Sequence, residues 1–222
     1  MNQLMPPTVQ PGTPAPDFAV PAVQEDRTIT LADFRGRSPL LLGLFPGLYC
    51  PFCRRAIAQM SASAEQLKPL GVESVAVVAT ELENARTYFR FRPTRVTLGA
   101  DPQLATHRSY GVPRPEPTPA LLEVISALPI NPTGELPKPL PALEAAAALD
   151  ALDGFRRTPT DEREAESSFT QLKGQFLIDR AGIVRWANIE CAKEGMAGLG
   201  KFPSADELLT AARLVSDRPL GV

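Results

Sequence analysis

The sequence has little of what would assign a chain to a disulfide-rich, nucleic-acid-binding or membrane class. Only three of its 222 residues are cysteine and one is histidine, too few for a disulfide framework. Lys and Arg number 23 against 25 Asp and Glu, and a formal charge of −2 gives no basic surface for nucleic acid. No apolar run approaches the roughly 18 residues that cross a bilayer. These absences argue against a disulfide-rich scaffold, a nucleic-acid-binding protein and a membrane-spanning protein.

The first residues, MNQLMPPTVQPGTPAPDF, have neither the charged region nor the apolar region of a secretory signal. We therefore expect a soluble, cytoplasmic protein. No glycine-rich phosphate loop or cluster of metal ligands appears, so we expect no nucleotide, flavin or metal cofactor. The apolar share of 44% is ordinary for a globular chain with a buried core.

Proline is the one residue in excess. There are 24 prolines, about twice the usual share of roughly 5%, and they gather in a leader, residues 1–16, and again over 113–141. Neither stretch can form a continuous helix or a central strand. We interpret the chain as one domain, residues 1–222, with residues 113–171 as a segment set within it, called the insertion below.

Strand and helix patterns alternate over the rest of the chain. Apolar runs predict buried strands at 39–45 and 72–79 and a short third strand at 96–98, with helical patterns at 50–67, 81–92 and 101–111. Within the insertion, residues 120–128 are compatible with a strand and 141–155 with a helix. Residues 175–188 are typical of a β-hairpin, and 204–216 of a helix capped by Ser204 and Glu207. The order predicts an α/β fold with a mixed central sheet flanked by helices.

The stretch FPGLYCPFCRR, residues 45–55, places two cysteines between a buried strand and the start of a helix. The positive end of a helix favours a thiolate, so Cys50 is the predicted nucleophile, and Pro51 suits the first helical position. Cys53, one turn further along, is placed to attack a mixed disulfide at Cys50. We expect Pro46, Gly47, Tyr49 and Phe52 to contact the substrate. Arg54 and Arg55 either add positive charge near the thiols or point to solvent.

Other interpretations of the pair stay open at this point. A zinc site needs four ligands, and only Cys191 and His107 remain, far away in sequence. The pair could also be a structural disulfide or two packed thiols in a redoxin-fold protein that only binds or senses a partner. Cys191 could act as a distal resolving thiol, form an intersubunit disulfide, or be a buried or idle thiol. His107 is expected to serve packing or the surface.

Six stretches in order carry a resemblance to a known family: APDF (15–18), ITLADFRGR (29–37), LLLGLF (40–45), CPFCRR (50–55), DPQLATHRSYGV (101–112) and QFLIDRAGIVRW (175–186). The chain resembles the thioredoxin-fold redoxins, and among these the alkyl hydroperoxide reductase/thiol-specific antioxidant group, the peroxiredoxin-like proteins. The resemblance implies a thioredoxin-like fold with a proline-rich and helical insertion before the final β-hairpin. It also implies a thiol-based oxidoreductase.

Three positions bear on which reaction the resemblance implies. Peroxiredoxins have a proline and a Thr or Ser seven and three residues before the reactive cysteine, where this chain has Gly43 and Gly47. An arginine that supports the thiolate in peroxiredoxins corresponds to Lys173, which either supplies that charge or is a solvated lysine near a strand end. Peroxide reduction and disulfide exchange therefore both remain open.

We predict that Cys50 attacks a hydroperoxide or a disulfide and that Cys53 closes an intramolecular disulfide. The predicted partners are that substrate and a reductant, either a thioredoxin-type protein or a small thiol. The insertion could cover the active site, bury a face or form a contact in a homodimer. No membrane or nucleic-acid partner is expected.

Overall fold

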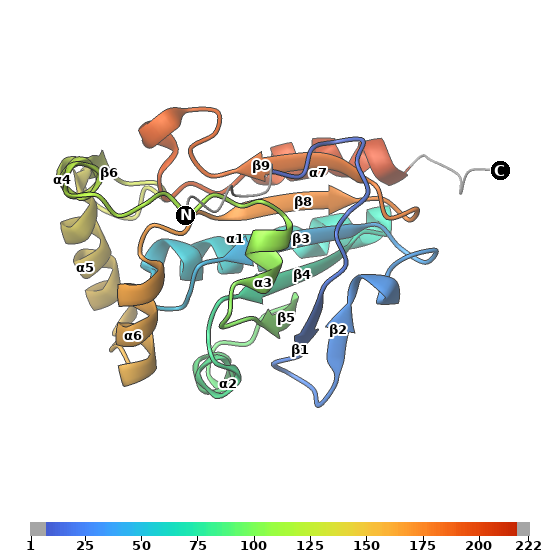
Figure 1. Ribbon diagram of the computed structural model, residues 1–222, viewed down its shortest axis with the longest axis horizontal. Coiled ribbons are helices and arrows are strands. Elements are labelled where there is room, and N and C mark those ends of the chain that lie inside the picture. Colours follow the sequence, from blue (N-terminus) through green and yellow to red (C-terminus); the bar gives the residue numbers. More distant parts are fainter. Residues whose placement is uncertain (1–7, 217–222) are drawn as a thin grey trace, which may run out of the picture.

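The apolar run after Pro39 forms the central strand of a five-stranded sheet, as predicted (Figure 1). The computed structural model describes residues 8–216. The strands follow the order β5-β4-β3-β8-β9, where β3 is Leu40–Phe45, β4 Glu73–Val78, β5 Thr97–Ala100, β8 Gly174–Ile178 and β9 Val184–Ile189. Strands β3, β4 and β5 are parallel, whereas β8 is antiparallel to β3 and β9 to β8. The predicted mixed sheet and terminal hairpin are therefore confirmed.

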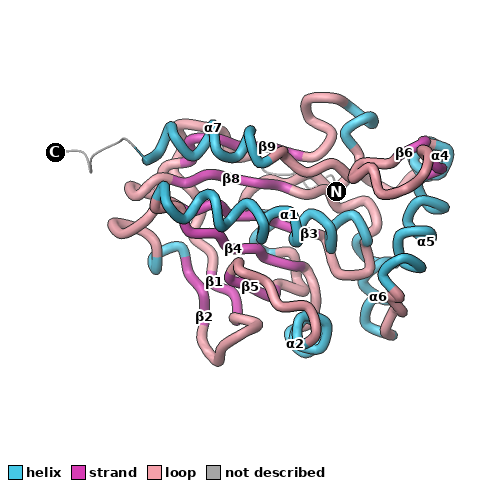
Figure 2. Tube along the Cα trace, turned by 180° about the vertical axis from the view of Figure 1, so that it is seen from behind, coloured by secondary structure: helices cyan, strands magenta, loops and turns pink. Residues whose placement is uncertain are grey.

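Strand β3 is buried on both faces because its side chains alternate between two cores. Leu41 and Phe45 belong to the core under α1 (Pro51–Leu67) and α7 (Ala205–Ser216), which Figure 2 shows in front of the sheet. Leu42 and Leu44 belong to the opposite core. That side is covered by the hairpin of β1 (Ala19–Pro21) and β2 (Thr28–Thr30) and by the segment around α3 (Ala105–Ser109).

The insertion forms its own group of elements at the end of the sheet where α1 begins (Figures 1 and 2). These are α4 (Pro119–Ala127), β6 (Pro129–Ile130), β7 (Leu140–Pro141), α5 (Ala142–Asp153) and α6 (Pro159–Ser168). Phe52 of α1 packs in a third core with insertion side chains that include Ile130, Ala145 and Leu149. The remaining elements are α2 (Leu82–Arg90) and three 3₁₀ helices, Leu31–Asp33, Lys68–Leu70 and Gly195–Gly198.

One prediction for the insertion needs correction, and one helix was missed. The strand expected at 120–128 is wrong, because Pro119–Ala127 is helix α4. Thr118 caps it by accepting the backbone N–H of Leu121, and Pro119 takes the first helical position, so the cap outweighs the β-branched Val124 and Ile125. Helix α6 was not predicted at all.

Helix α6 also begins with an N-terminal cap followed by proline. Thr158 and Asp161 form a capping box, and Pro159 is the first helical residue. The capping box predicted for the last helix is present, with Glu207 accepting the N–H of Ser204 and Ser204 accepting that of Glu207.

The proline-rich leader runs along the terminal hairpin. Gly12 donates its N–H to the carbonyl of Val184, and Ala15 donates to Gly182. Residues 1–7 of the predicted leader lie outside the described residues. Within residues 8–216 no helix is both long and apolar enough to span a membrane.

Candidate active site

Cys50 lies at the start of α1, where the strand–turn–helix pattern predicted it. Strand β3 ends at Phe45, residues 46–49 turn the chain, and Pro51 is the first helical residue. Cys50 itself keeps an extended backbone, with φ −91° and ψ 112°, at the positive end of the helix. It is partly exposed, whereas Cys53 is only 1% exposed, and both are free thiols.

The surroundings of the two thiols move their pKa values in opposite directions. The hydrogen bond from Cys53 lowers the pKa of Cys50 from 9.0 to about 7; burial opposes this, while the charge of Lys173 and the backbone N–H of Cys53 assist it. Burial, together with the neighbouring Cys50, raises the pKa of Cys53 well above its ordinary value. At neutral pH roughly half of Cys50 is thiolate while Cys53 keeps its proton. The difference suits Cys50 as nucleophile and Cys53 as resolver, roles that stay predictions.

Lys173 is a buried cation beside these thiols, so the solvated alternative is wrong. The residue is 1% exposed, and its Nζ lies 2.8 Å from Oε1 of Glu190. Burial acts to lower the pKa of Lys173, but Glu190 and the two cysteines outweigh it and hold that pKa above its ordinary value. A lysine buried this completely keeps its proton only because a carboxylate accompanies it.

Glu190 is the site residue that sequence reasoning missed. One carboxylate oxygen accepts the backbone N–H of Lys173 at 3.0 Å, and the other accepts the N–H of Gly200 at 2.7 Å as well as the Lys173 ammonium. Strand β8 pairs with β9 so that Gly174 faces Ile189, which makes Lys173 and Glu190 the next pair along the ladder. A bulge between Leu177 and Ile178 shifts this register by one residue. Counting back from the turn without the bulge would place Lys173 opposite Ile189.

Arg54 and Arg55 do not serve the thiolate, and neither points to solvent. The Arg54 guanidinium contacts Asp150 at 2.5 Å and Asp153 at 2.9 Å, and it stacks on the ring of Phe155 with 3.8 Å to the centroid. Arg55 donates to both oxygens of Asp153 at 2.9 Å and to Glu135 at 2.8 Å. Every carboxylate partner belongs to the insertion. The two arginines therefore bind α1 to α5, and Asp153 contacts both of them.

An apolar pocket of about 300 Å³ lies where the insertion meets the start of α1. Cys50, Cys53, Lys173 and Glu190 line it, and so do three of the four predicted substrate contacts, Pro46, Tyr49 and Phe52. The insertion contributes mainly apolar side chains, namely Pro115, Leu121, Ile125, Ala142, Leu143, Ala146, Ala165 and Phe169. The insertion therefore walls the pocket into which the candidate nucleophile is set.

A CxxC at a helix start, a lysine next to the neighbouring strand and a mixed sheet are the features that the sequence resemblance implies. A family model described as the AhpC/TSA family matches residues 11–187. The chain belongs to the AhpC/TSA family. With its redoxin fold, membership makes the protein a thiol-based oxidoreductase.

Solved structures share the fold at low sequence identity. The reduced 2-Cys peroxiredoxin of Plasmodium vivax is 16% identical with a TM-score of 0.58, covering 94% of this chain and 81% of its own. Peroxidoxin BcpB from Mycobacterium tuberculosis is 15% identical with a TM-score of 0.58, covering 93% and 98%. The thiol:disulfide interchange protein DsbE from Chlorobium tepidum is 20% identical with a TM-score of 0.50, covering 94% and 99%. No curated protein matches the chain.

This AhpC/TSA protein has no room for a hydroxyl-bearing side chain at Gly47. A Cβ there would lie 2.5 Å from the ring of Tyr49, closer than side-chain carbons approach. The ring is buried and held in place, because the Tyr49 hydroxyl donates to the carbonyl of Ser168 in α6 at 2.9 Å. Gly47 does not line the pocket. Gly43 lies in β3, where an added Cβ would meet Met60 and the Phe45 ring at 2.8 Å.

Two further candidates of this AhpC/TSA chain have different outcomes. Cys191 is partly exposed and lines the pocket, and burial raises its pKa to about 11, so it is a thiol at neutral pH. His107 is fully buried in α3, outside the pocket, and burial lowers its pKa to about 4. The expectation of a packing histidine is confirmed.

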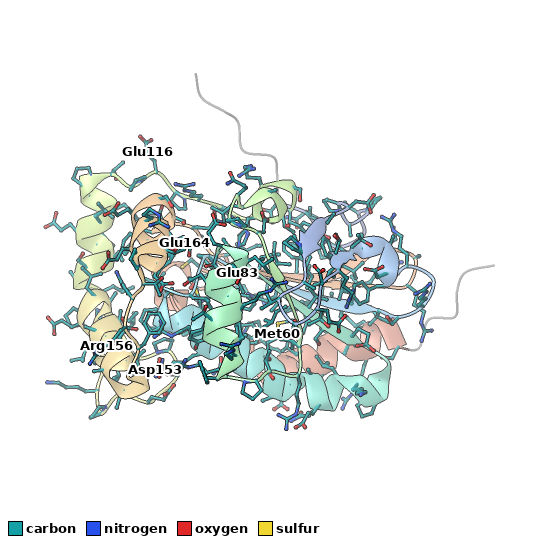
Figure 3. All side chains as sticks on the ribbon, turned by 90° about the horizontal axis from the view of Figure 1, so that it is seen from below. Met60, Glu83, Glu116, Asp153, Arg156 and Glu164 are labelled. Carbon is teal, nitrogen blue, oxygen red and sulfur yellow. The ribbon has the colours of Figure 1, made fainter. Side chains whose placement is uncertain are left out.

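Glu164 of α6 is a half-buried carboxylate beside α2 (Figure 3). It accepts the backbone N–H of Glu81 at 3.0 Å, at the start of α2. Burial raises its pKa from 4.5 to about 7. The carboxylate therefore ties the insertion to the main sheet layer in a way that depends on pH.

Proposed function

We propose that the protein is a thiol peroxidase whose substrates are organic hydroperoxides with an apolar body. The observation that carries the proposal is the apolar pocket at Cys50. Its volume, about 300 Å³, is at the lower end of the range for organic ligand sites. Hydrogen peroxide, with two heavy atoms, would fill little of it, since a water molecule occupies about 30 Å³.

In the proposed reaction the Cys50 thiolate attacks the terminal oxygen of the hydroperoxide. An S–O bond forms as the O–O bond breaks, Cys50 becomes a sulfenic acid, and the leaving alkoxide takes a proton and departs as an alcohol. The Cys53 thiol then attacks the Cys50 sulfur, a disulfide forms and water is released. A thioredoxin-type protein or a small thiol supplies two electrons and two protons to regenerate both thiols.

The chain supplies three of the requirements. The pKa of Cys50, about 7, provides thiolate at neutral pH. The buried Lys173 gives a fixed positive charge next to the site where the negative charge of the leaving oxygen develops. The apolar side chains of the insertion line one side of the pocket and limit the access of water to it.

Disulfide exchange is the second candidate, and the environment of Gly47 favours it. The Tyr49 ring fills the space where a peroxiredoxin hydroxyl would help to hold the peroxide. On this alternative Cys50 attacks a disulfide sulfur of a partner, so that one partner thiol leaves and a mixed disulfide remains. Cys53 then attacks the Cys50 sulfur, the Cys50–Cys53 disulfide forms and the second partner thiol leaves.

Stopped-flow kinetics separate the two. We expect reduced protein to react with cumene hydroperoxide far faster than a free thiol of the same pKa does, and faster than with hydrogen peroxide. The Cys53→Ser variant should accumulate a sulfenic acid that dimedone traps, whereas the wild type should lose two thiols per turnover. If cumene hydroperoxide reacts no faster than with a free thiol while a protein disulfide is reduced rapidly, the peroxidase proposal fails and disulfide exchange stands.

A further inference from the structure

One positively charged side chain lines the otherwise apolar part of the pocket that the insertion forms. Arg157 lies in the segment between α5 and α6 and lines the same space as Cys50. Within residues 8–216 it has neither a hydrogen-bond nor an ion-pair partner, and it is exposed. The pocket's other cation, Lys173, is paired with Glu190.

Three other arginines of this region are already engaged, and the exposed neighbour Arg156 does not line the pocket. Arg54 and Arg55 form ion pairs with insertion carboxylates, and Arg114 donates to the carbonyl of Ser167. Arg157 is thus a positive charge at an apolar pocket with no counter-charge from the described part of the protein. A guanidinium presents a planar fork that matches a carboxylate.

The insertion also leaves large apolar side chains uncovered at this pocket. Leu143 at the start of α5 is 51% exposed, and Phe169 just after α6 is 41% exposed, although both line the pocket. Apolar surface of this kind, next to a catalytic thiol, is what an aliphatic chain would cover.

We infer that the substrate of the proposed reaction is an amphipathic carboxylate, a hydroperoxide of a medium-length fatty acid, whose carboxylate binds Arg157. The aliphatic body lies against the insertion side chains such as Leu143 and Phe169, and the hydroperoxide reaches Cys50. Charge complementarity favours this occupant over a neutral hydroperoxide, since a neutral chain leaves Arg157 without a partner. The inference rests on the proposed function for its reactive group only, because binding of the carboxylate needs no chemistry.

Binding is tested with decanoate, which carries no hydroperoxide, by calorimetric titration of the reduced protein. We expect decanoate to bind, to slow alkylation of Cys50, and to bind more weakly as salt rises. The Arg157→Gln variant should bind it more weakly, by up to about fivefold, the upper end of the range for an exposed ion pair, and Arg157→Lys should recover part of the loss. Arg156→Gln is the matched control, because Arg156 is the exposed neighbour that does not line the pocket (Figure 3).

Three results would overturn the inference. Decanol could bind as tightly as decanoate, Arg157→Gln could leave decanoate binding unchanged, or Arg156→Gln could weaken it by the same factor. The first outcome would mean that the pocket binds neutral chains as well as charged ones. The second would mean that Arg157 does not contribute to binding, and the third that only the net charge of the protein does.

A kinetic comparison keeps this inference distinct from the proposed function. With a fatty-acid hydroperoxide and its methyl ester as substrates, wild type should prefer the free acid and Arg157→Gln should lose that preference while still reducing the ester. If neither compound is reduced but decanoate binds through Arg157, the peroxidase proposal fails and the carboxylate site stands. If both are reduced equally by wild type, the peroxidase proposal stands and the carboxylate site fails.

Discussion

Replacing Lys173 by methionine removes the buried charge beside the thiols while keeping most of the side-chain volume. The structure predicts two separable effects. Cys50 loses a cation that lowers its pKa, and Glu190 loses its ion-pair partner while remaining 8% exposed. A buried carboxylate left without its partner costs about 3–5 kcal/mol of folding free energy.

The effect on Cys50 follows from its present pKa of about 7. An adjacent opposite charge typically moves an acid's pKa by at least about one unit, so without Lys173 the pKa of Cys50 should rise to about 8 or above. The thiolate fraction at pH 7 would then fall from about one half to about one tenth, and alkylation at pH 7 would slow about fivefold. At pH 10 the two proteins should react at similar rates.

The same change alters how stability depends on pH. The folded pKa of Cys50, about 7, lies below its ordinary value of 9.0, so the unfolded chain binds more protons between these values. Stability therefore gains a contribution from Cys50 as pH rises from about 7 to 9, and loses it as pH falls through 7. Lys173→Met should flatten this rise.

The assay is iodoacetamide labelling against pH, read by mass spectrometry on the peptide that contains Cys50. Lys173→Met/Glu190→Gln is the companion variant, because it removes both charges. It should recover stability, and the pKa of Cys50 should lie between those of wild type and Lys173→Met, since Glu190 raises that pKa. An unchanged pKa of Cys50 in both variants would refute the role given to Lys173.

Three further changes test other contacts. Asp153→Asn removes the carboxylate shared by Arg54 and Arg55. It should lower the free energy of unfolding by about 1–3 kcal/mol and speed amide hydrogen exchange in α5 but not in β3. Unchanged exchange in α5 would contradict the role of Asp153 in anchoring α5 to α1. The pKa of Glu164 is about 7 in the folded protein against an ordinary value of 4.5, so the protonated carboxyl stabilises the fold and this stabilisation is lost as pH rises through 7. In urea denaturation, Glu164→Gln should therefore be more stable than wild type at pH 8 but not at pH 6. Equal stability of the two proteins at both pH values would refute the shifted pKa. Gly47→Ala should lower stability by about 1–3 kcal/mol, whereas Gly198→Ala, where a Cβ has no atom nearer than 3.4 Å, should be nearly neutral in thermal unfolding.

Local patterns predicted the sheet and the start of α1 because each depends on a short stretch of chain. An apolar run flanked by Pro39 and Pro46 gives a strand buried on both faces, and a cysteine followed by proline gives a capped helix start. Helix α4 was misread because Val124 and Ile125 favour strands while Thr118 and Pro119 start a helix. Here capping chemistry outweighs intrinsic preference.

The ion pairs of the site could not be predicted from local sequence patterns. Glu190 meets Lys173 only through the pairing of β8 with β9, and the bulge at Leu177 changes that pairing by one residue. Arg54 and Arg55 are far in sequence from the carboxylates of α5 that bind them. Such contacts depend on register and on how the insertion packs, and neither is encoded in a short window.

The insertion's carboxylates have a consequence for anyone who would trim this protein to a minimal redoxin. Cutting out residues 113–171 as a dispensable loop would delete Asp150 and Asp153, which pair with Arg54, and also Phe155, on whose ring the Arg54 guanidinium stacks. A shortened chain would therefore lose the contacts that fix the first turn of α1, where Cys50 and Cys53 lie. The insertion thus holds in place the helix that carries Cys50 and Cys53, although it is distant from that helix in sequence.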